Sequence, residues 1–122
     1  MAYLLHLNTF SEDKGKLTVI EKKLPFQIKR IFYIYDVDDS VRGRHRHRKT
    51  IQAAICIKGS CTVTNHDGKS RHTFVLDRPD LCLILEPADW HSMEKFTKDA
   101  VLLVMASEEF DVNDYIYEEY HT

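Results

Sequence analysis

The sequence has 122 residues, a formal net charge of −2 and 43% hydrophobic residues, which fits one globular domain spanning residues 1–122. This charge balance excludes a general electrostatic attraction to nucleic acid or to an anionic membrane. No stretch is long and apolar enough to span a bilayer, and residues 1–10 lack the pattern of a secretion signal, so we expect a cytoplasmic protein with no membrane partner.

Short apolar or β-branched runs separated by turn residues recur along the chain, and each predicts a strand. The runs are, in order, 16–21, 29–37, 51–57, 61–66, 71–76, 81–87 and 100–107. Turns are expected at Lys58-Gly59 and at Asp67-Gly68, where glycine accepts the positive φ of a tight hairpin. Only 110–120 is expected to form a helical turn or a tail. The sequence therefore predicts an all-β sandwich or barrel.

A basic run between the second and third of these strands contains candidate functional residues. Its sequence is VRGRHRHRKTIQ, from Val41 to Gln52. If it is extended, alternation places His45 and His47 on one face and the intervening arginines on the other. Arg42 has the opposite parity, but Gly43 can break the alternation and turn Arg42 towards the histidines. We therefore expect a histidine pair with one arginine beside it.

The spacing of this run resembles the first motif of the cupin superfamily. His45-x-His47 is followed by Gln52 and then by a glycine at a turn, and EPADWH supplies the proline and His91 of the second motif. This resemblance implies a jelly-roll barrel (a double-stranded β-helix) with the site inside. Metal-binding cupins have a glutamate where this chain has Gln52, a much poorer ligand. Three histidines alone can hold zinc, so a metal-dependent cupin, a dioxygenase or a metal-assisted isomerase, stays open as an alternative.

Five segments together resemble a narrower family, the sugar-nucleotide 3,4-ketoisomerases (FdtA/QdtA-like, WxcM-like cupins). They are PFQIKRIFYIYDV, VRGRHRHRKTIQ, KGSCTVTNHDGK, LILEPADWHSM and VLLVMASEEFDVNDYI. The resemblance implies an isomerase that converts dTDP-4-keto-6-deoxyglucose to a 3-keto sugar during deoxyaminosugar biosynthesis for bacterial surface polysaccharide. It also implies that no metal or cofactor is used and that two subunits exchange N-terminal strands in a homodimer.

The same resemblance assigns functional roles to Arg42, His45 and His47, with Tyr33 lining the site. Moving a ketone to the adjacent carbon needs a base, an acid and a group that stabilises the enediolate, and a neutral imidazole suits the first two. We expect His47 to remove the C3 proton and His45 to move protons to the oxygens or to C4, although the residues do not distinguish the two.

The remaining site residues are expected to bind substrate. Arg42 would pair with the diphosphate, and Tyr33 and Gln52 would hydrogen-bond sugar hydroxyls. His91 is either a further substrate-binding residue or a structural histidine. Nucleic-acid binding by the basic run is disfavoured because the chain is acidic overall and contains no nucleic-acid-binding motif. A cupin that binds a small ligand without catalysis stays open as a third possibility.

Overall fold

The computed structural model describes residues 1–121, which form β-strands and one short 3₁₀ turn. The elements are β1 (Tyr3–His6), β2 (Asn8–Glu12), β3 (Gly15–Val19), β4 (Arg30–Tyr35), β5 (Arg42–His47), β6 (Gln52–Lys58), β7 (Cys61–His66), β8 (Arg71–Leu76), β9 (Leu81–Leu85), β10 (Trp90–Glu94), β11 (Val101–Ala106), η1 (Val112–Asp114) and β12 (Tyr115–Ile116). Within residues 1–121, no helix is long and apolar enough to cross a membrane.

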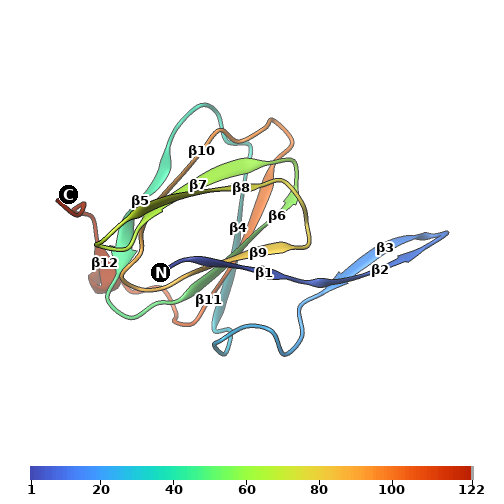
Figure 1. The fold of residues 1–122 in the computed structure, drawn as a ribbon, viewed down its shortest axis with the longest axis horizontal. Helices are drawn as coiled ribbons and strands as arrows, with labels where there is room; N and C mark the ends of the chain where they lie inside the picture. The colour runs from blue at the N-terminus through green and yellow to red at the C-terminus, as the bar shows by residue number, and fades with distance from the viewer. Residues whose placement is uncertain (122) are drawn as a thin grey trace.

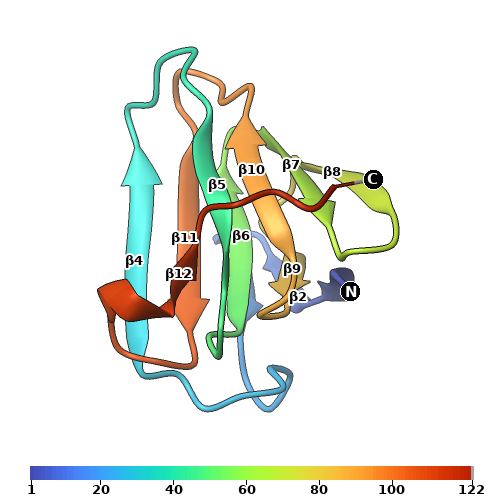
Figure 2. The ribbon, with the colours of Figure 1, turned by 90° about the vertical axis from the view of Figure 1, so that its left-hand side faces the viewer.

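Two five-stranded antiparallel sheets face each other in a jelly-roll arrangement (Figures 1 and 2). One sheet has the order β1-β9-β6-β11-β4 and the other the order β12-β5-β10-β7-β8. Strands β2 and β3 form a separate hairpin that projects from the body in Figure 1. The prediction of an all-β jelly roll is confirmed.

The sequence pattern of each strand follows from what covers its faces. Strand β4 lies at a sheet edge and alternates between partly buried and exposed residues. Strands β6 and β9 lie inside the first sheet, and their residues 53–56 and 82–85 are apolar and buried on both faces. Their inner faces join a core between the sheets, and their outer faces pack under Ile20, Leu24 and Phe26. Continuous apolar runs therefore mark the strands that are covered on both sides.

Both predicted glycine turns are present, one between β6 and β7 and one between β7 and β8. Gly59 has a φ of +68° between β6 and β7, and Gly68 has a φ of +96° between β7 and β8. Asp67 Oδ1 accepts hydrogen bonds from the backbone N–H groups of Lys69 and Ser70, which closes the second turn. The single predicted helical turn is η1, whose N-cap is Asp111.

Strand β10, Trp90–Glu94, was not among the predicted strands. Its sequence, WHSME, lacks a β-branched or aliphatic run, so its local propensity for strand is weak. It is extended because it is hydrogen-bonded on both sides, to β5 and to β7. This strand carries His91 into the second sheet beside the histidines of β5.

Candidate active site

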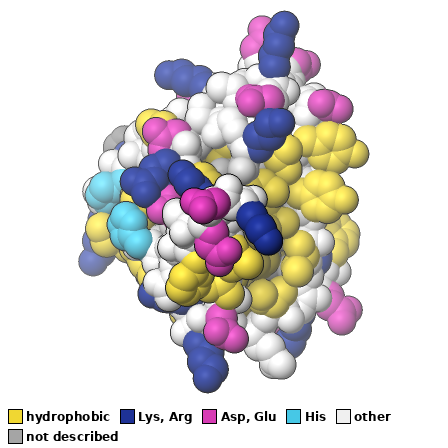
Figure 3. All heavy atoms as spheres, turned by 90° about the vertical axis from the view of Figure 1, so that its right-hand side faces the viewer, with side chains coloured by type: hydrophobic (Ala, Val, Ile, Leu, Met, Phe, Trp, Pro, Cys, Tyr) yellow, Lys and Arg dark blue, Asp and Glu magenta, His cyan; other side chains and the backbone are white. Residues whose placement is uncertain are grey.

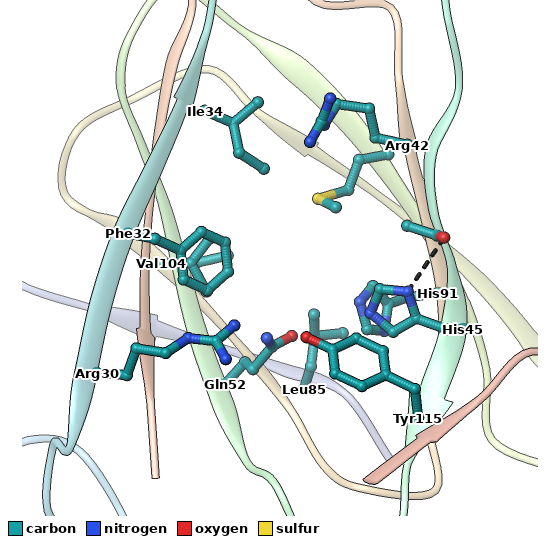
Figure 4. Close-up of a pocket in the computed structure, with 13 residues that line it drawn as sticks. Arg30, Phe32, Ile34, Arg42, His45, Gln52, Leu85, His91, Val104 and Tyr115 are labelled. Atoms are coloured by element: carbon teal, nitrogen blue, oxygen red, sulfur yellow. Dashed lines mark hydrogen bonds between the residues drawn. The ribbon is translucent and has the colours of Figure 1, made fainter. Parts of the chain in front are cut away.

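A cavity of about 180 Å³ lies between the two sheets, beside the edge strand β4 and strand β5 (Figure 4). One part of its lining is apolar and continues the core between the sheets. The other part is polar and comes from β4, β5, β6, β10 and β12. The polar lining residues are Arg30, Arg42, His45, Gln52, His91 and Tyr115.

A bulge in β5 brings Arg42 and His45 to the same cavity. The pairing with β10 aligns His91 with His45 but Ser92 with Gly43, so one residue, Arg44, is inserted. Gly43 and Arg44 both have positive φ, +82° and +61°. A Cβ on Gly43 would lie 3.1 Å from the carbonyl oxygen of His91, so this position favours glycine. The expected break of alternation at Gly43 is confirmed.

His45 lines the cavity, and its ring orientation is fixed by the same bulge. Its Nδ1 lies 3.1 Å from the carbonyl oxygen of Gly43. A carbonyl oxygen only accepts, so Nδ1 carries the proton and Nε2 is a free base. Burial, together with the nearby His47, lowers the pKa of His45 to about 4, against a smaller raising effect of the Gly43 bond. The imidazole is therefore neutral near pH 7 and able to accept a proton.

His47 is buried next to His45 but does not line the cavity. The two rings meet edge to face with centroids 5.0 Å apart. His47 Nδ1 donates to Asp114 Oδ2 at 2.9 Å, and its buried Nε2 has no hydrogen-bond partner in the described chain. Burial lowers the pKa of His47, although the hydrogen bond and charge of Asp114 act in the opposite direction.

Asp114 holds His47 through a hydrogen-bond network that sequence reasoning missed. Its Oδ1 accepts from the backbone N–H groups of Arg48 and Lys49 at 3.1 and 2.8 Å. Its Oδ2 accepts from His47 and from the hydroxyl of Thr50. Burial alone would raise the pKa of this carboxyl, but these bonds outweigh it and hold the pKa below its ordinary value. The signal for Asp114 in the sequence is its place in VLLVMASEEFDVNDYI, the last of the five segments that resemble the family.

His91 and Gln52 lie where the sequence predicted, in the cavity wall. His91 is 2% exposed, and its Nδ1 donates to the carbonyl oxygen of Asp89 at 3.1 Å. Burial, with a further contribution from His45, lowers the pKa of His91 to about 3, so this ring is also neutral. The rings of His45 and His91 are 4.8 Å apart. The structure thus brings Arg42, His45, Gln52 and His91 together around one space.

Tyr33 does not line the cavity, contrary to prediction. Strand β4 alternates, and its inward residues are Arg30, Phe32 and Ile34. Tyr33 is 61% exposed on the outward face, where its ring stacks on Tyr35 at 5.9 Å. Alternation correctly separates the two sets of residues on β4, but it does not say which set faces the interior. Sequence reasoning therefore missed Arg30, which follows from the same alternation once the inward face is known.

Tyr115 is a further lining residue that was not predicted. Strand β12 pairs with β5 so that Tyr115 aligns with His47. The Tyr115 ring lies 4.7 Å from each of the rings of His45 and His47. In Figure 4 its hydroxyl points into the cavity, towards Gln52. The site therefore contains a phenol as well as imidazoles.

Arg46, an arginine on the outer face of the basic run, contacts the C-terminal segment. Arg46 lies between the two histidines in sequence but on the outer face of β5, as its parity predicted. Its Nη1 donates to the hydroxyl of Tyr120 at 2.6 Å, and its guanidinium lies 4.2 Å from the centre of that ring. The hydroxyl of Tyr120 in turn donates to the carbonyl oxygen of Ala88. The C-terminal segment is thus tied across the back of the site.

The charge of the cavity suits an anionic ligand. Arg30 and Arg42 lie on different sides of it (Figure 4), and its lining within residues 1–121 includes no Asp or Glu. Among these residues, no group of three or more His, Cys, Asp or Glu side chains is arranged to hold a metal ion. The two guanidinium groups are suited to bind phosphate oxygens.

Comparison with known proteins gives a consistent set of relatives. Residues 2–122 match the family model FdtA, described as WxcM-like, C-terminal. A TDP-4-oxo-6-deoxy-alpha-D-glucose-3,4-oxoisomerase from Aneurinibacillus thermoaerophilus is 39% identical over 116 residues, which are 93% of this chain and 84% of that protein.

Two solved structures show the same fold at similar identity. A 3,4-ketoisomerase from Helicobacter canadensis has a TM-score of 0.91 and 36% identity over 96% of this chain and 90% of that one. The QdtA 3,4-ketoisomerase from Thermoanaerobacterium thermosaccharolyticum, solved as a histidine-to-asparagine mutant with TDP-4-keto-6-deoxyglucose, has a TM-score of 0.91 and 38% identity over 96% of this chain and 87% of that one.

Proposed function

We propose that the chain is a sugar-nucleotide 3,4-ketoisomerase. This proposal starts from the family: the chain belongs to the FdtA family (WxcM-like, C-terminal). Its substrate is dTDP-4-keto-6-deoxyglucose, the class of compound that its relatives act on or bind. The product is the corresponding 3-keto-6-deoxyhexose. The observation that carries this proposal is a neutral imidazole, His45, that lines the same cavity as Arg42, where the described residues contribute no carboxylate.

The reaction begins with removal of the proton on C3, which the C4 carbonyl acidifies. We assign this step to His45 rather than to His47, because His45 lines the cavity and His47 is buried behind it. The electron pair of the C3–H bond moves to O4 and forms an enediolate. Guanidinium and amide N–H groups of Arg30 and Gln52 stabilise that charge from the cavity wall. The imidazolium of His45 then returns its proton to C4, and the O3 proton passes to O4, so that the isomerisation ends with no net gain or loss of protons.

The size of the cavity divides the substrate into two parts. Pockets for drug-sized ligands usually measure about 300–1,000 Å³. A cavity of about 180 Å³ fits one sugar ring, so the nucleoside lies outside it. The diphosphate then lies at the cavity entrance, where Arg42 binds it with a planar guanidinium.

We also propose a homodimer that exchanges N-terminal strands, with each chain forming one domain, 1–122. The β2–β3 hairpin supports this, because it projects from the body and every residue of β2 is exposed. Its apolar side chains Phe10 and Leu17 are 57% and 60% exposed. Figure 3, which looks onto the side from which the hairpin projects, shows hydrophobic side chains gathered there. We place the protein in the cytoplasm, in deoxyaminosugar synthesis for bacterial surface polysaccharide.

Proton NMR in D₂O tests the activity directly. EDTA-treated protein incubated with dTDP-4-keto-6-deoxyglucose is expected to give a 3-keto sugar with solvent deuterium at C4, and the couplings report the C4 configuration. The His45→Asn variant should lose turnover, whereas His121→Asn, a change at a side chain 91% exposed, should retain it. Turnover that appears only after a divalent metal is restored would contradict the metal-free reaction, and silence under both conditions would contradict the enzyme assignment.

A further inference from the structure

The cavity has an apolar wall that the proposed reaction does not use. The wall consists of side chains of the first sheet that carry no hydrogen-bonding group, namely Phe32, Ile34, Ala54, Leu85 and Val104. These side chains continue the core between the sheets. Phe32 on β4 is paired directly with Val104 on β11, and Figure 4 shows both across the cavity from His45. The wall therefore suits a part of the substrate that makes no hydrogen bonds.

Within residues 1–121, the backbone of this wall adds no hydrogen-bonding group for a ligand. Strand β11 lies inside the first sheet and is paired with β4 on one side and with β6 on the other, so the N–H and C=O groups around Val104 belong to the ladder. The Arg30 guanidinium lies 4.7 Å from the centre of the Phe32 ring and 5.4 Å from that of Phe110, and in the proposed reaction it serves O4. A hydroxyl buried against Phe32 and Val104 would thus leave water without gaining a partner from the wall.

The proposed reaction determines how a hexose ring lies in the cavity. The diphosphate is attached to C1, so C1 is turned towards Arg42, and the proton that His45 removes is on C3. Because C1, C3 and C5 are alternate members of a six-membered ring, C5 points away from the other two. In Figure 4 Arg42 lies at the top of the cavity and His45 on its right, and the remaining direction meets Phe32 and Val104. C4 then lies between C3 and C5 and faces Gln52, which agrees with the role proposed for that amide at O4.

We propose that Phe32 and Val104 form the subsite for the C6 methyl group, and that this subsite selects 6-deoxy sugars over sugars with a hydroxyl on C6. The inference rests on the proposed ketoisomerase function. C6 is attached to C5 and so contacts the apolar wall. A methyl group buries apolar area there and loses no hydrogen bond. A C6 hydroxyl would lose its hydrogen bonds to water at the same place.

The selectivity is measured as a ratio of kcat/KM values, with formation of the 3-keto sugar followed by proton NMR. The two substrates are dTDP-4-keto-6-deoxyglucose and its 6-hydroxy analogue, dTDP-4-ketoglucose. The unaltered protein should prefer the 6-deoxy sugar by about 100-fold, because an apolar pocket typically rejects an added hydroxyl by about that factor. dTDP-4-ketoxylose, which lacks C6 altogether, should be converted at least about tenfold less efficiently than the 6-deoxy sugar, because it leaves the subsite empty.

Val104→Thr tests the wall itself, because it keeps the shape of the side chain and adds a hydroxyl. The variant should narrow the preference for the 6-deoxy sugar roughly five- to tenfold, which is about what one hydrogen bond contributes. Val63→Thr is the matched control. Val63 is buried in the same core, on β7, and is not among the described residues that line the cavity. This control should leave the preference unchanged.

Three results would overturn the subsite. The first is a preference that Val104→Thr leaves unchanged, and the second is a preference that Val63→Thr narrows equally. The third is equal conversion of the 6-deoxy and 6-hydroxy sugars by the unaltered protein, a measurement that does not depend on the folding of any variant. If the unaltered protein converts none of the three sugars, it is the ketoisomerase function that fails.

Discussion

Replacing Asp114 with asparagine tests how the site fixes the proton of His47. The carboxylate accepts from four donors, two backbone N–H groups on Oδ1 and the side chains of His47 and Thr50 on Oδ2. An asparagine has one oxygen, so its NH₂ group must face one of these donor pairs. The backbone groups cannot reorient, so the NH₂ group faces His47, which must then move its proton from Nδ1 to Nε2.

The expected cost follows from the number and type of bonds. Hydrogen bonds to a charged group contribute about 1.5–3 kcal/mol each, and Asp114→Asn weakens two at a buried position. Partial compensation by the amide and by rotation of the Thr50 hydroxyl leaves a loss of about 2–4 kcal/mol. For a chain of this size that lowers Tm by roughly 10 °C.

The assay combines thermal unfolding with ¹⁵N NMR of the imidazole. In the unaltered protein His47 should show the Nδ1–H tautomer, and in Asp114→Asn the Nε2–H tautomer. Asp111→Asn is the control, because Asp111 is the N-cap of η1 and asparagine caps equally well. A Tm no lower than that of this control, or an unchanged tautomer, would refute the reasoning.

The pH dependence of the same contribution has a definite sign. The pKa of Asp114 is lower in the folded protein than in the unfolded chain. Its stabilisation is therefore fully present above about pH 3.9, the ordinary pKa of aspartate, and is lost as the pH falls through the lower folded value. Urea unfolding between pH 7 and pH 3 should show the difference between the unaltered protein and Asp114→Asn narrowing only at the acid end.

Two further outcomes are expected. If His45 is the base, kcat/KM should be constant from about pH 6 to 8 and should fall at acid pH with a midpoint near the pKa of His45, about 4, because the base must be unprotonated. Initial rates measured across this range that show a midpoint near 6.5 would contradict this assignment. Tyr120→Leu should lower the free energy of unfolding by about 1–2 kcal/mol, because it removes both the ring and the hydroxyl that contact Arg46. Tyr120→Phe removes only the hydroxyl and should show a smaller decrease. Urea denaturation in which the leucine variant is as stable as the unaltered protein would contradict a stabilising role for the contact.

Local pattern alone was enough for most of the strands. Apolar runs that are buried on both faces, such as those of β6 and β9, must be extended and internal wherever they occur in an all-β chain. Glycine at positive φ places the turns at Gly59 and Gly68 whatever surrounds them. The pairing of His45 and His47 on one side of β5 likewise needs only the two-residue repeat of a strand.

Tertiary structure decided what the repeat leaves open. Alternation on β4 separates Tyr33 from Phe32, but only packing against the second sheet shows that Phe32 faces the cavity and Tyr33 faces outward. Packing also decides which of the two histidines lines the cavity. His45 meets the cavity and His47 is buried against Asp114.

The sequence by itself therefore determined the all-β fold, which follows from short-range rules, and the family resemblance singled out Arg42, His45, Gln52 and His91, which line one cavity. Only the folded chain decided which imidazole lines the cavity, and that a distant segment, Asp114-Tyr115, lies against the histidines. Asp114 reaches His47 across 67 positions of sequence. No local pattern records such a contact, since it exists only once β12 has paired with β5.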